Sequence, residues 1–495
     1  MNKQAIPEMI EWCRKIGYEV CGSPIWIPCP RSPLTERQPS DFDRLKPIHI
    51  AGTKGKGSTS AFISSILAQY LPSASQSNSK VEKIGLYTSP HLRFVRERIQ
   101  INNEPLSEQS FAGYFFEVWD HLTAAAEAEG IPSDAPQAKP VYFRYLTLMA
   151  FHAYLTEKVD TAIIECGIGG EYDSTNVLVH PTVTAITSLG IDHVAMLGNT
   201  LGEIAWHKSG IFKPGSVALT VPQPEEAMTV LRQRAEEKGV HLHVVERHPE
   251  LDSLKLGLSA DFQKKNASLA IAVAAAHLRA LGHADIPDLS TPNTSPLPAE
   301  FRKGLEEVRW PGRCDIRREG NIAWHIDGGH TLDSIEVAGR WFAEQISASS
   351  ASSASARRKI RILIFNQQTR DASALALALH KTLQSSVSGT VDTASPFTHA
   401  IFCTNVTFRD SGYKPDLVSV NTNASDVESL AVQNRLAKTW AEVDPGTGVR
   451  VVRTIEDAVA TAREIANAEA EEDEAMVLVT GSLHLVGGLI DVLES

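Results

Sequence analysis

Short apolar runs alternate along the chain with stretches whose apolar residues recur at helical spacing. Segments 47–51, 84–87, 161–165 and 183–187 are each a continuous apolar run that ends in a polar, Gly-containing loop, as is typical of buried strands. A helix is predicted over about 58–70, directly after the first of these strands and its Gly-rich turn. Strands that alternate with helices in this way predict an α/β architecture.

A second α/β set begins after the motif Trp310-Pro-Gly-Arg313. Its predicted strands are segments 322–326, 360–365, 399–403 and 476–480. We therefore place a domain boundary near residue 310, which gives an N-terminal domain over 1–309 and a C-terminal domain over 310–495.

Three further segments have the composition of flexible surface insertions, because they hold too little apolar area to form a core. They are rich in Ser, Pro, Thr or Ala and cover residues 72–80, 285–299 and 347–356.

The composition of the 495 residues is that of an ordinary globular protein, with 43% hydrophobic and 21% charged residues. A formal charge of -12 argues against nucleic acid or anionic membranes as partners. Six cysteines without a C-x-x-C pair predict reduced thiols in a cytosolic protein. No apolar run approaches the ~20 residues of a membrane span. The first residues include Glu8 and Glu11 and predict neither a secretory signal nor a transit peptide.

The segment from His49 to Thr59 has the composition of a phosphate-binding loop between a strand and a helix. Glycines let the backbone approach an anion, and the helix start adds free N–H groups and a positive dipole end. Lys56 could reach the β- and γ-phosphates, and Ser58 could offer a hydroxyl to Mg²⁺. The spacing departs from G-x-x-x-x-G-K-[ST], because Ile50 replaces the first Gly and Gly57 follows the lysine. A simple Gly-rich turn is the alternative, and the absence of N-K-x-D disfavours a regulatory GTPase.

Polar residues follow other predicted strands, at the edge where open α/β sheets place ligands. Glu165 opens the loop Glu-Cys-Gly-Ile-Gly-Gly170 and suits Mg²⁺, which prefers oxygen donors. His193 alone would be typical of a structural histidine, but beside Glu165 and a phosphate loop it is a candidate metal ligand. Lys208 alone would be a solvated lysine at a helix end.

The turn Thr88-Ser-Pro-His-Leu92 also follows a strand. Ser89 could donate an oxygen to Mg²⁺, although the turn could be purely structural. Arg93, Arg96 and Arg98 come next; they form either a solvated basic loop or a loop that attracts a polyanionic substrate.

Several motifs resemble those of eukaryotic folylpolyglutamate synthases, the folate branch of the Mur ligase superfamily. The phosphate loop follows that branch's G-T-x-G-K-G-[ST], and the remaining motifs are Ile84-Gly-Leu-Tyr-Thr-Ser-Pro-His-Leu92, Arg96-Glu-Arg-Ile99, Phe143-Arg-Tyr-Leu-Thr-Leu-Met-Ala-Phe-His152, Glu165-x-Gly-x-Gly-Gly170, Trp310-Pro-Gly-Arg313 and Thr480-Gly-Ser-Leu-His-Leu-Val-Gly-Gly488. They run in order from about residue 47 to the end. The resemblance implies an N-terminal P-loop NTPase-like domain with folate-binding loops, a C-terminal Rossmann-like domain on the glutamate and nucleotide side, and an active site between them.

The resemblance also implies roles for individual residues. Ser89 and Glu165 match one Mg²⁺ site, His193 matches a second, and Lys208 matches a lysine that many members carry as a carbamate. K⁺ is a further candidate cation. The implied ATP contacts are Gly52, Thr53, Lys54, Gly55, Lys56, Gly57, Ser58, Asn266, Arg313 and Asp327, and the implied folate contacts are Arg98, Phe143 and Arg144. His330 matches a catalytic-site histidine, although Thr331 and Leu332 stand where many bacterial members have Asn-Pro.

The implied function is ATP-dependent ligation of L-glutamate to the γ-carboxylate of folate through an acyl phosphate. The nearest alternative is a dihydrofolate synthase or a bifunctional enzyme; a cell-wall Mur ligase and a non-catalytic nucleotide-binding protein are the others. Folate, L-glutamate and ATP are the expected partners of a monomer that has no nucleic-acid partner and no membrane segment. The expected location is the cytoplasm, or the mitochondrion for a longer isoform with a leader.

Overall fold

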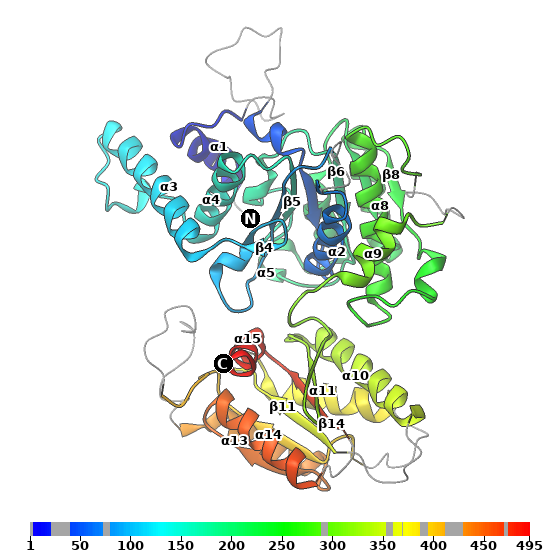
Figure 1. Cartoon of the computed structure of the whole chain (residues 1–495). Helices are drawn as coiled ribbons and strands as arrows, with labels where there is room; N and C mark the ends of the chain where they lie inside the picture. Colours follow the sequence, from blue (N-terminus) through cyan, green and yellow to red (C-terminus); the bar gives the residue numbers. More distant parts are fainter. Residues whose placement is uncertain are drawn as a thin grey trace, which may run out of the picture. The chain divides into compact units, whose positions relative to one another are not determined.

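The computed structural model describes residues 3–20, 40–72, 80–288, 296–352, 360–368, 370–386, 395–410, 429–469 and 474–495. They form two compact units (Figure 1). The larger unit comprises Met1–His91, Arg96–Gly257 and Phe262–Arg309, and the smaller comprises Leu92–Val95, Leu258–Asp261 and Trp310–Ser495. Each unit has its own sheet.

The larger unit has an eight-stranded sheet in the order β4-β3-β2-β5-β1-β6-β7-β8. At its centre, β1 (Ile48–Ala51) runs parallel to β5 (Thr161–Glu165) and to β6 (Val183–Ile186). On the far side of β5 lies β2 (Ile84–Tyr87), also parallel. The edges are formed by antiparallel β3 (Ile99–Ile101) and β4 (Glu104–Pro105), and by parallel β7 (Val217–Thr220) and β8 (Leu242–Val244).

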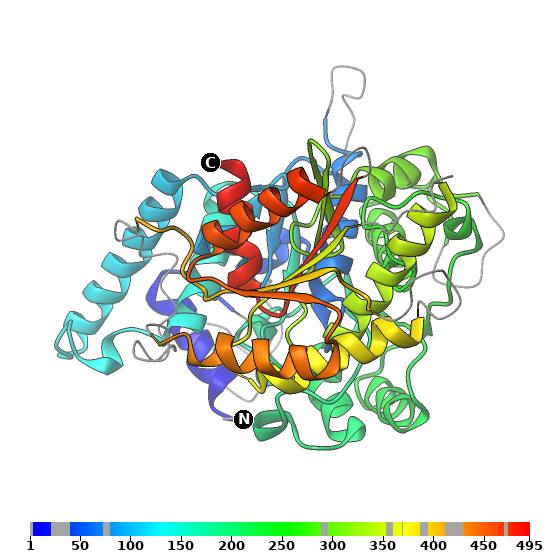
Figure 2. The same cartoon turned by 90° about the horizontal axis from the view of Figure 1, so that it is seen from below.

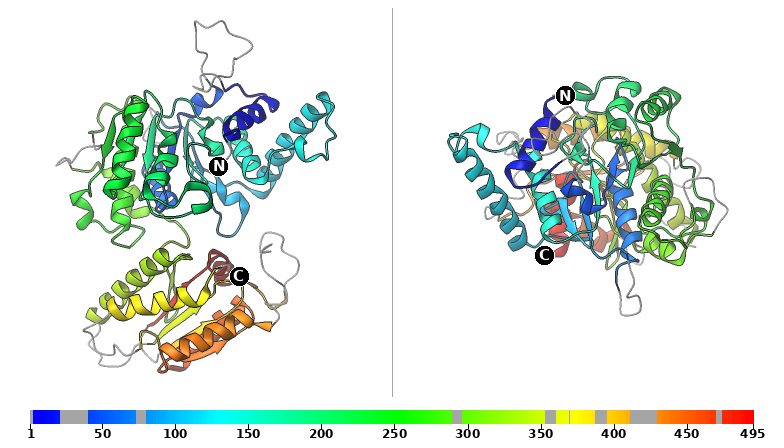
Figure 3. Two further views of the ribbon diagram at one scale, coloured as in Figure 1. Left: turned by 180° about the vertical axis from the view of Figure 1, so that it is seen from behind. Right: turned by 90° about the horizontal axis from the view of Figure 1, so that it is seen from above.

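The helices of the larger unit are distributed along this sheet. Figure 3 shows the dark blue α1 and the cyan α3 at one end and the green α7 and α8 at the other. Alanines on α8 let it pack closely against α2, and α7 packs against α6. The bounds are α1 (Ala5–Lys15), α2 (Lys56–Ala68), α3 (Glu108–Ala128), α4 (Tyr142–Thr156), α5 (Val194–Leu197), α6 (Leu201–Lys208), α7 (Glu225–Glu237), α8 (Gln263–Ala280) and α9 (Ala299–Glu307).

The smaller unit has a six-stranded sheet in the order β13-β12-β11-β14-β10-β9, parallel except for β9. Alternate residues of each central strand enter two separate apolar cores, as the two-residue period of a strand requires. Thus Ile362 and Ile364 pack with α14 and α15, whereas Leu363 and Phe365 pack with α10, α11 and α13 (Figure 2). The unit is a three-layer α/β/α structure.

The bounds of its strands are β9 (Asp315–Glu319), β10 (Ile322–Ile326), β11 (Arg361–Phe365), β12 (His399–Phe402), β13 (Gly448–Val451) and β14 (Ala475–Thr480). Those of its helices are α10 (Leu332–Ser352), α11 (Ala372–Ser386), α13 (Ala431–Val443), α14 (Ile455–Glu469) and α15 (Leu483–Glu494). The α/β fold class predicted from the apolar runs is confirmed.

Three local predictions need correction or restriction. The helix behind the phosphate loop begins at Lys56 rather than 58, because Gly55 with its positive φ forms the N-cap. The Ser/Ala-rich segment 347–356 is not wholly an insertion: α10 continues to Ser352, and Ser347 bonds the carbonyl four residues back. Residues 353–356 of that segment lie outside the described residues. Much of the other two predicted insertions does so as well, because residues 73–79 and 289–295 are not described.

Four cysteines in the described ranges, Cys13, Cys166, Cys314 and Cys403, are free and buried, whereas Cys21 and Cys29 lie outside them. Within the described part of the chain, no helix combines the length and apolar character needed to cross a membrane.

Candidate active site

The predicted phosphate loop leaves the carboxyl end of β1, the central strand of the larger unit. The backbone N–H groups of Thr53 and Lys54 both donate to the Ser188 carbonyl oxygen, at 3.1 and 3.0 Å. The Thr53 hydroxyl donates to the Gly190 carbonyl oxygen at 3.0 Å. The loop is therefore tied to the segment that follows β6, on the next strand of the sheet.

At two of the loop glycines, neighbouring atoms leave no room for a side chain. Gly52 has φ +152°, and a Cβ there would lie 1.8 Å from Thr187 Oγ1. Gly55 has φ +88°, and its Cβ would lie 2.3 Å from Oδ1 of Asn266, a buried residue of α8. Asn266 also donates to Gln263 at 2.8 Å. The predicted nucleotide residue Asn266 thus lies directly against the phosphate loop.

Lys56, the first residue of α2, lies beside Glu165, the last residue of β5. The Lys56 Nζ to Glu165 Oε1 distance is 3.7 Å, and the side chains are 16% and 2% exposed. The helix start adds its own positive dipole end. The structure therefore brings together the lysine and the carboxylate that the sequence placed in separate motifs.

Ser89 and His193 follow β2 and β6, so both leave the carboxyl edge of the sheet that also carries Glu165. Ser89 is half-buried. His193 is a left-handed residue with φ +51°, and its side chain is 43% exposed. Its backbone N–H donates to Asp192 Oδ1 at 2.8 Å.

These residues fit a cation that shares its shell with a nucleotide. Among the described residues, no three His, Cys, Asp or Glu side chains form a group that could hold a metal by themselves. Mg²⁺ normally takes one or two carboxylates and completes its shell with water and substrate phosphates. The one buried carboxylate at Glu165 matches that mode of binding, and Ser89 follows β2, the strand beside β5.

Lys208 is the last residue of α6, and its amine reaches the phosphate loop. The side chain is only 3% exposed, and Nζ donates to the Gly52 carbonyl oxygen at 2.7 Å. Burial lowers the pKa of this amine to about 7, and the nearby charge of Lys56 acts in the same direction. A substantial neutral fraction is therefore present at neutral pH.

The predicted folate residues separate into two places. The Arg98 guanidinium is buried, lies 5.3 Å from the centre of the Phe143 ring and donates from Nε to His91 Nδ1 at 2.9 Å. The Phe143 ring covers Gly167, where a Cβ would lie 2.3 Å from Phe143 Cε1. Arg98 and Phe143 thus adjoin the loop that begins at Glu165. Arg144 instead forms an ion pair with Glu8 of α1.

The remaining predicted residues lie together in the smaller unit, at the carboxyl end of β10. The buried Asp327 accepts hydrogen bonds from the backbone N–H groups of Cys314 and Gly329, at 3.0 and 2.9 Å. Burial raises the pKa of Asp327, and the Arg313 guanidinium opposes that effect. His330 bonds through Nδ1 to the Gly328 carbonyl oxygen at 2.9 Å.

One residue that shapes the site was missed by the sequence analysis. Asp173 accepts from the backbone N–H of Ile168 at 2.9 Å and from that of Thr175 at 3.0 Å. It therefore fixes the Gly-rich loop after Glu165. The only signal was an Asp directly before Ser-Thr, a pattern typical of a helix N-cap.

No family model matches the chain. A curated folylpolyglutamate synthase from Neurospora crassa is 46% identical over 460 residues, which cover 92% of this chain and 82% of that protein. One from Saccharomyces cerevisiae is 43% identical over 496 residues, covering 100% of this chain and 82% of that protein. The chain belongs to the folylpolyglutamate synthases. The family predicted from the motifs is thereby confirmed.

Solved folylpolyglutamate synthase structures share the fold. The Mycobacterium tuberculosis enzyme complexed with ADP has a TM-score of 0.64 at 22% identity, covering 92% of this chain and 93% of that chain. An FPGS–AMPPCP–folate complex has a TM-score of 0.59 at 21% identity, covering 92% and 93%.

Proposed function

We propose that this chain ligates L-glutamate to the γ-carboxylate of tetrahydrofolate and folylpolyglutamates at the expense of ATP. The observation that carries this proposal is an intact phosphate loop in a chain of this family. Lys56 of that loop lies beside the buried Glu165, and the Lys208 amine donates a hydrogen bond to the Gly52 carbonyl oxygen of the loop. A carboxylate is a poor electrophile, so the reaction needs an activation step.

In that step a carboxylate oxygen of folate attacks the γ-phosphorus of ATP, and the bond to the bridging oxygen breaks to release ADP. The amine of glutamate then attacks the acyl carbon, and phosphate leaves as the amine proton is lost. Lys56 and the loop N–H groups are the groups proposed to stabilise charge on the transferring phosphoryl group. Asn266, Arg313 and Asp327 are the further proposed nucleotide contacts.

Ser89 and Glu165 would hold one Mg²⁺, and His193 a second. Bound Mg²⁺ would offset negative charge on the phosphates. K⁺ has no assigned residue. Arg98 and Phe143 are proposed folate contacts, because a cation on an aromatic ring offers both charge and a flat apolar surface. His330, which lies in the smaller unit, is a further proposed catalytic residue.

Lys208 is proposed to carry a carbamate in the active enzyme. Its neutral amine would attack CO₂ and lose a proton, which leaves an anion beside the phosphate loop. The buried position and the pKa of about 7 support this chemistry, since only the neutral amine reacts. A high-resolution density map tests it: density that ends at a bare nitrogen in a fully active preparation would refute the carbamate.

The mechanism is tested with folate whose γ-carboxylate carries isotopically labelled oxygen. An acyl phosphate requires one labelled oxygen to appear in the released phosphate, and unlabelled phosphate would exclude it. Comparing dihydropteroate with tetrahydrofolate as the glutamate acceptor tests the alternative. We expect turnover with tetrahydrofolate as the acceptor. Turnover with dihydropteroate but not with tetrahydrofolate would instead identify a dihydrofolate synthase.

A further inference from the structure

Two segments of the larger unit lie backbone against backbone, and each leads directly to a residue of the proposed site. One is 170–171, at the end of the loop that begins at Glu165; the other is 207–210, which contains Lys208. The N–H of Glu171 donates to the His207 carbonyl oxygen at 2.7 Å. A Cβ on Gly170 would lie 2.7 Å from the Lys208 carbonyl oxygen, so the contact leaves no room for a side chain.

Gly210, in the other segment, also leaves no room for a side chain, because a Cβ added there would lie 2.2 Å from Glu171 Cα. The Asn176 side-chain amide bridges the pair: Nδ2 donates to the carbonyl oxygens of Glu171 and Gly210, at 3.1 and 3.3 Å. Lys213 donates to the backbone carbonyl of Asn176 at 3.3 Å. The relative position of the two segments is therefore set by several directed bonds.

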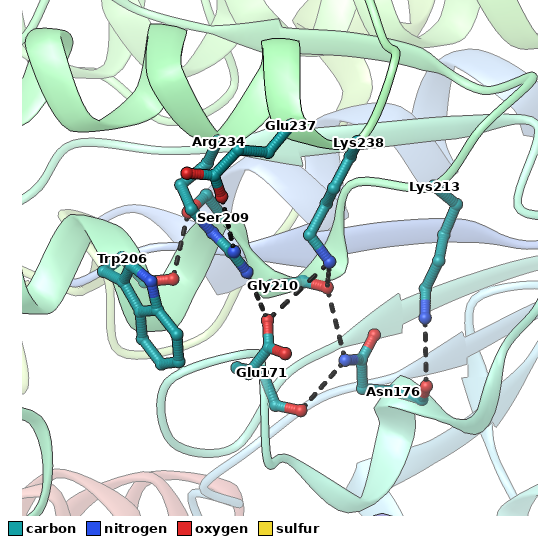
Figure 4. A network of polar contacts seen from close by, with 9 residues as sticks. All are labelled: Glu171, Asn176, Trp206, Ser209, Gly210, Lys213, Arg234, Glu237 and Lys238. Atoms are coloured by element: carbon teal, nitrogen blue, oxygen red, sulfur yellow. Dashed lines mark hydrogen bonds and ion pairs between the residues drawn. The ribbon is translucent and has the colours of Figure 1, made fainter. Parts of the chain in front are cut away.

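The carboxyl end of α7 supplies the cations of this network (Figure 4). Arg234 donates from Nη2 to Glu171 Oε2 at 2.7 Å and from Nη1 to Glu237 at 2.9 Å. Its guanidinium also lies 4.8 Å from the centre of the Trp206 ring on α6. Lys238 donates to the Gly210 carbonyl oxygen at 3.2 Å and lies 3.7 Å from Glu171 Oε2. We call Glu171, Asn176, Arg234 and Lys238 the clamp.

Apolar contacts also hold α7 on the unit. Apolar residues of α7, among them Ala227, Met228 and Leu231, already pack into one buried core with Ala205 and Phe212. That core includes Ile211 and Phe212, directly after the segment, but no side chain of 207–210 itself. Directed polar bonds can fix the backbone of 207–210, because hydrogen bonds and ion pairs depend on geometry more than apolar contacts do.

We propose that the clamp is a positioning device for Lys208, which holds its amine on the Gly52 carbonyl and keeps Glu165 beside Lys56. This inference rests on the proposed function, since it assigns Lys208 and Glu165 to the reacting site. Arg234 and Lys238 touch neither residue directly. They act through the Glu171 carboxylate and the Gly210 carbonyl, so they are positioning residues.

The test compares Arg234→Met with Arg234→Lys and with a matched control on the same helix, Arg232→Met. Arg232 pairs only with the exposed Glu225 among the described residues, so its loss should change nothing. Arg234→Met should lower kcat about tenfold to a hundredfold, the range for a misplaced reacting group, with the KM values for folate and glutamate unchanged. Arg234→Lys should recover only part of that loss, because it keeps a cation beside Glu171 but not the two-pronged guanidinium.

Hydrogen exchange supplies a readout that does not depend on turnover. Arg234→Met should speed exchange in peptides covering 166–172 and 207–211, and Arg232→Met should not. If exchange is unchanged, or if it rises while kcat equals that of Arg232→Met, the proposal is overturned. Lys238→Met, which removes the bond to Gly210, replaces Arg234→Met if the latter does not fold. A wild type that ligates no glutamate refutes the proposed function, and exchange alone then decides whether the clamp orders 207–211.

Discussion

A Cβ at position 55 should abolish nucleotide binding in a protein that still folds. Gly55→Ala places a methyl group 2.3 Å from Asn266 Oδ1, on a backbone with φ +88°. An L-residue in the left-handed region costs about 1–2 kcal/mol. Displacing the buried Asn266 side chain adds about 1–3 kcal/mol, the usual range for overpacking. We therefore expect a loss of about 2–5 kcal/mol in the free energy of unfolding.

Gly17→Ala is the matched control, because Gly17 has φ +92° and a Cβ there would meet nothing within 4 Å. This variant introduces the backbone strain without the overpacking, and we expect it to lower the free energy of unfolding by about 1–2 kcal/mol. Urea denaturation measures both variants, and calorimetry with a non-hydrolysable ATP analogue measures Kd. Gly55→Ala should weaken Kd at least tenfold and Gly17→Ala should leave it unchanged. Equal Kd values for the two variants would refute the account of the loop.

Substitutions at three further residues probe the charges around the loop. Lys56→Ala should lower kcat by about 10²–10³ in a folded protein, as is usual for losing one charge contact to the transition state; steady-state kinetics that give wild-type kcat would contradict this. Glu165→Gln should raise the Mg²⁺ concentration needed for half-maximal activity, because the amide lacks the charge that a hard cation favours, and an unchanged Mg²⁺ titration would exclude the ligand role. Lys208→Ala should lose most activity, whereas Lys208→Glu should keep a little, since it restores an anion; equal activities would argue against an anionic group there. In protein freed of CO₂, where Lys208 is an unmodified amine, its pKa falls from 10.5 to about 7 on folding, so between these values the unfolded chain holds the extra proton and the free energy of unfolding rises with pH. Lys208→Met should flatten that rise in denaturation curves, and an equally steep rise would place the lowered pKa elsewhere.

The central strands were predictable because their apolar runs are short, continuous and bounded by turn residues. The predictions for 84–87, 161–165 and 322–326 match β2, β5 and β10 residue for residue. Edge strands were missed, since β8 and β13 are partly exposed and carry no such run. A short Ser/Ala tract likewise cannot reveal that a helix continues through it, as α10 does.

The candidate site was predictable only where a motif carries its own chemistry. Lys56 and Glu165 each stand in a glycine-rich motif, and their 3.7 Å approach follows from the adjacency of β1 and β5. Asn266 came from the family resemblance, because one Asn in an Ala-rich helix has no local signal. Arg234 lies far along the chain from Glu171, and only the folded structure brings the two together.

The reaction itself provides the most direct test of the account. Purified chain is incubated with MgATP, L-glutamate and tetrahydrofolate, and phosphate release and product mass are followed together. We expect phosphate release only when all three substrates are present, and a folate product heavier by one glutamyl residue at each addition. Phosphate release that does not depend on folate and glutamate, with the folate mass unchanged, would contradict the proposed function.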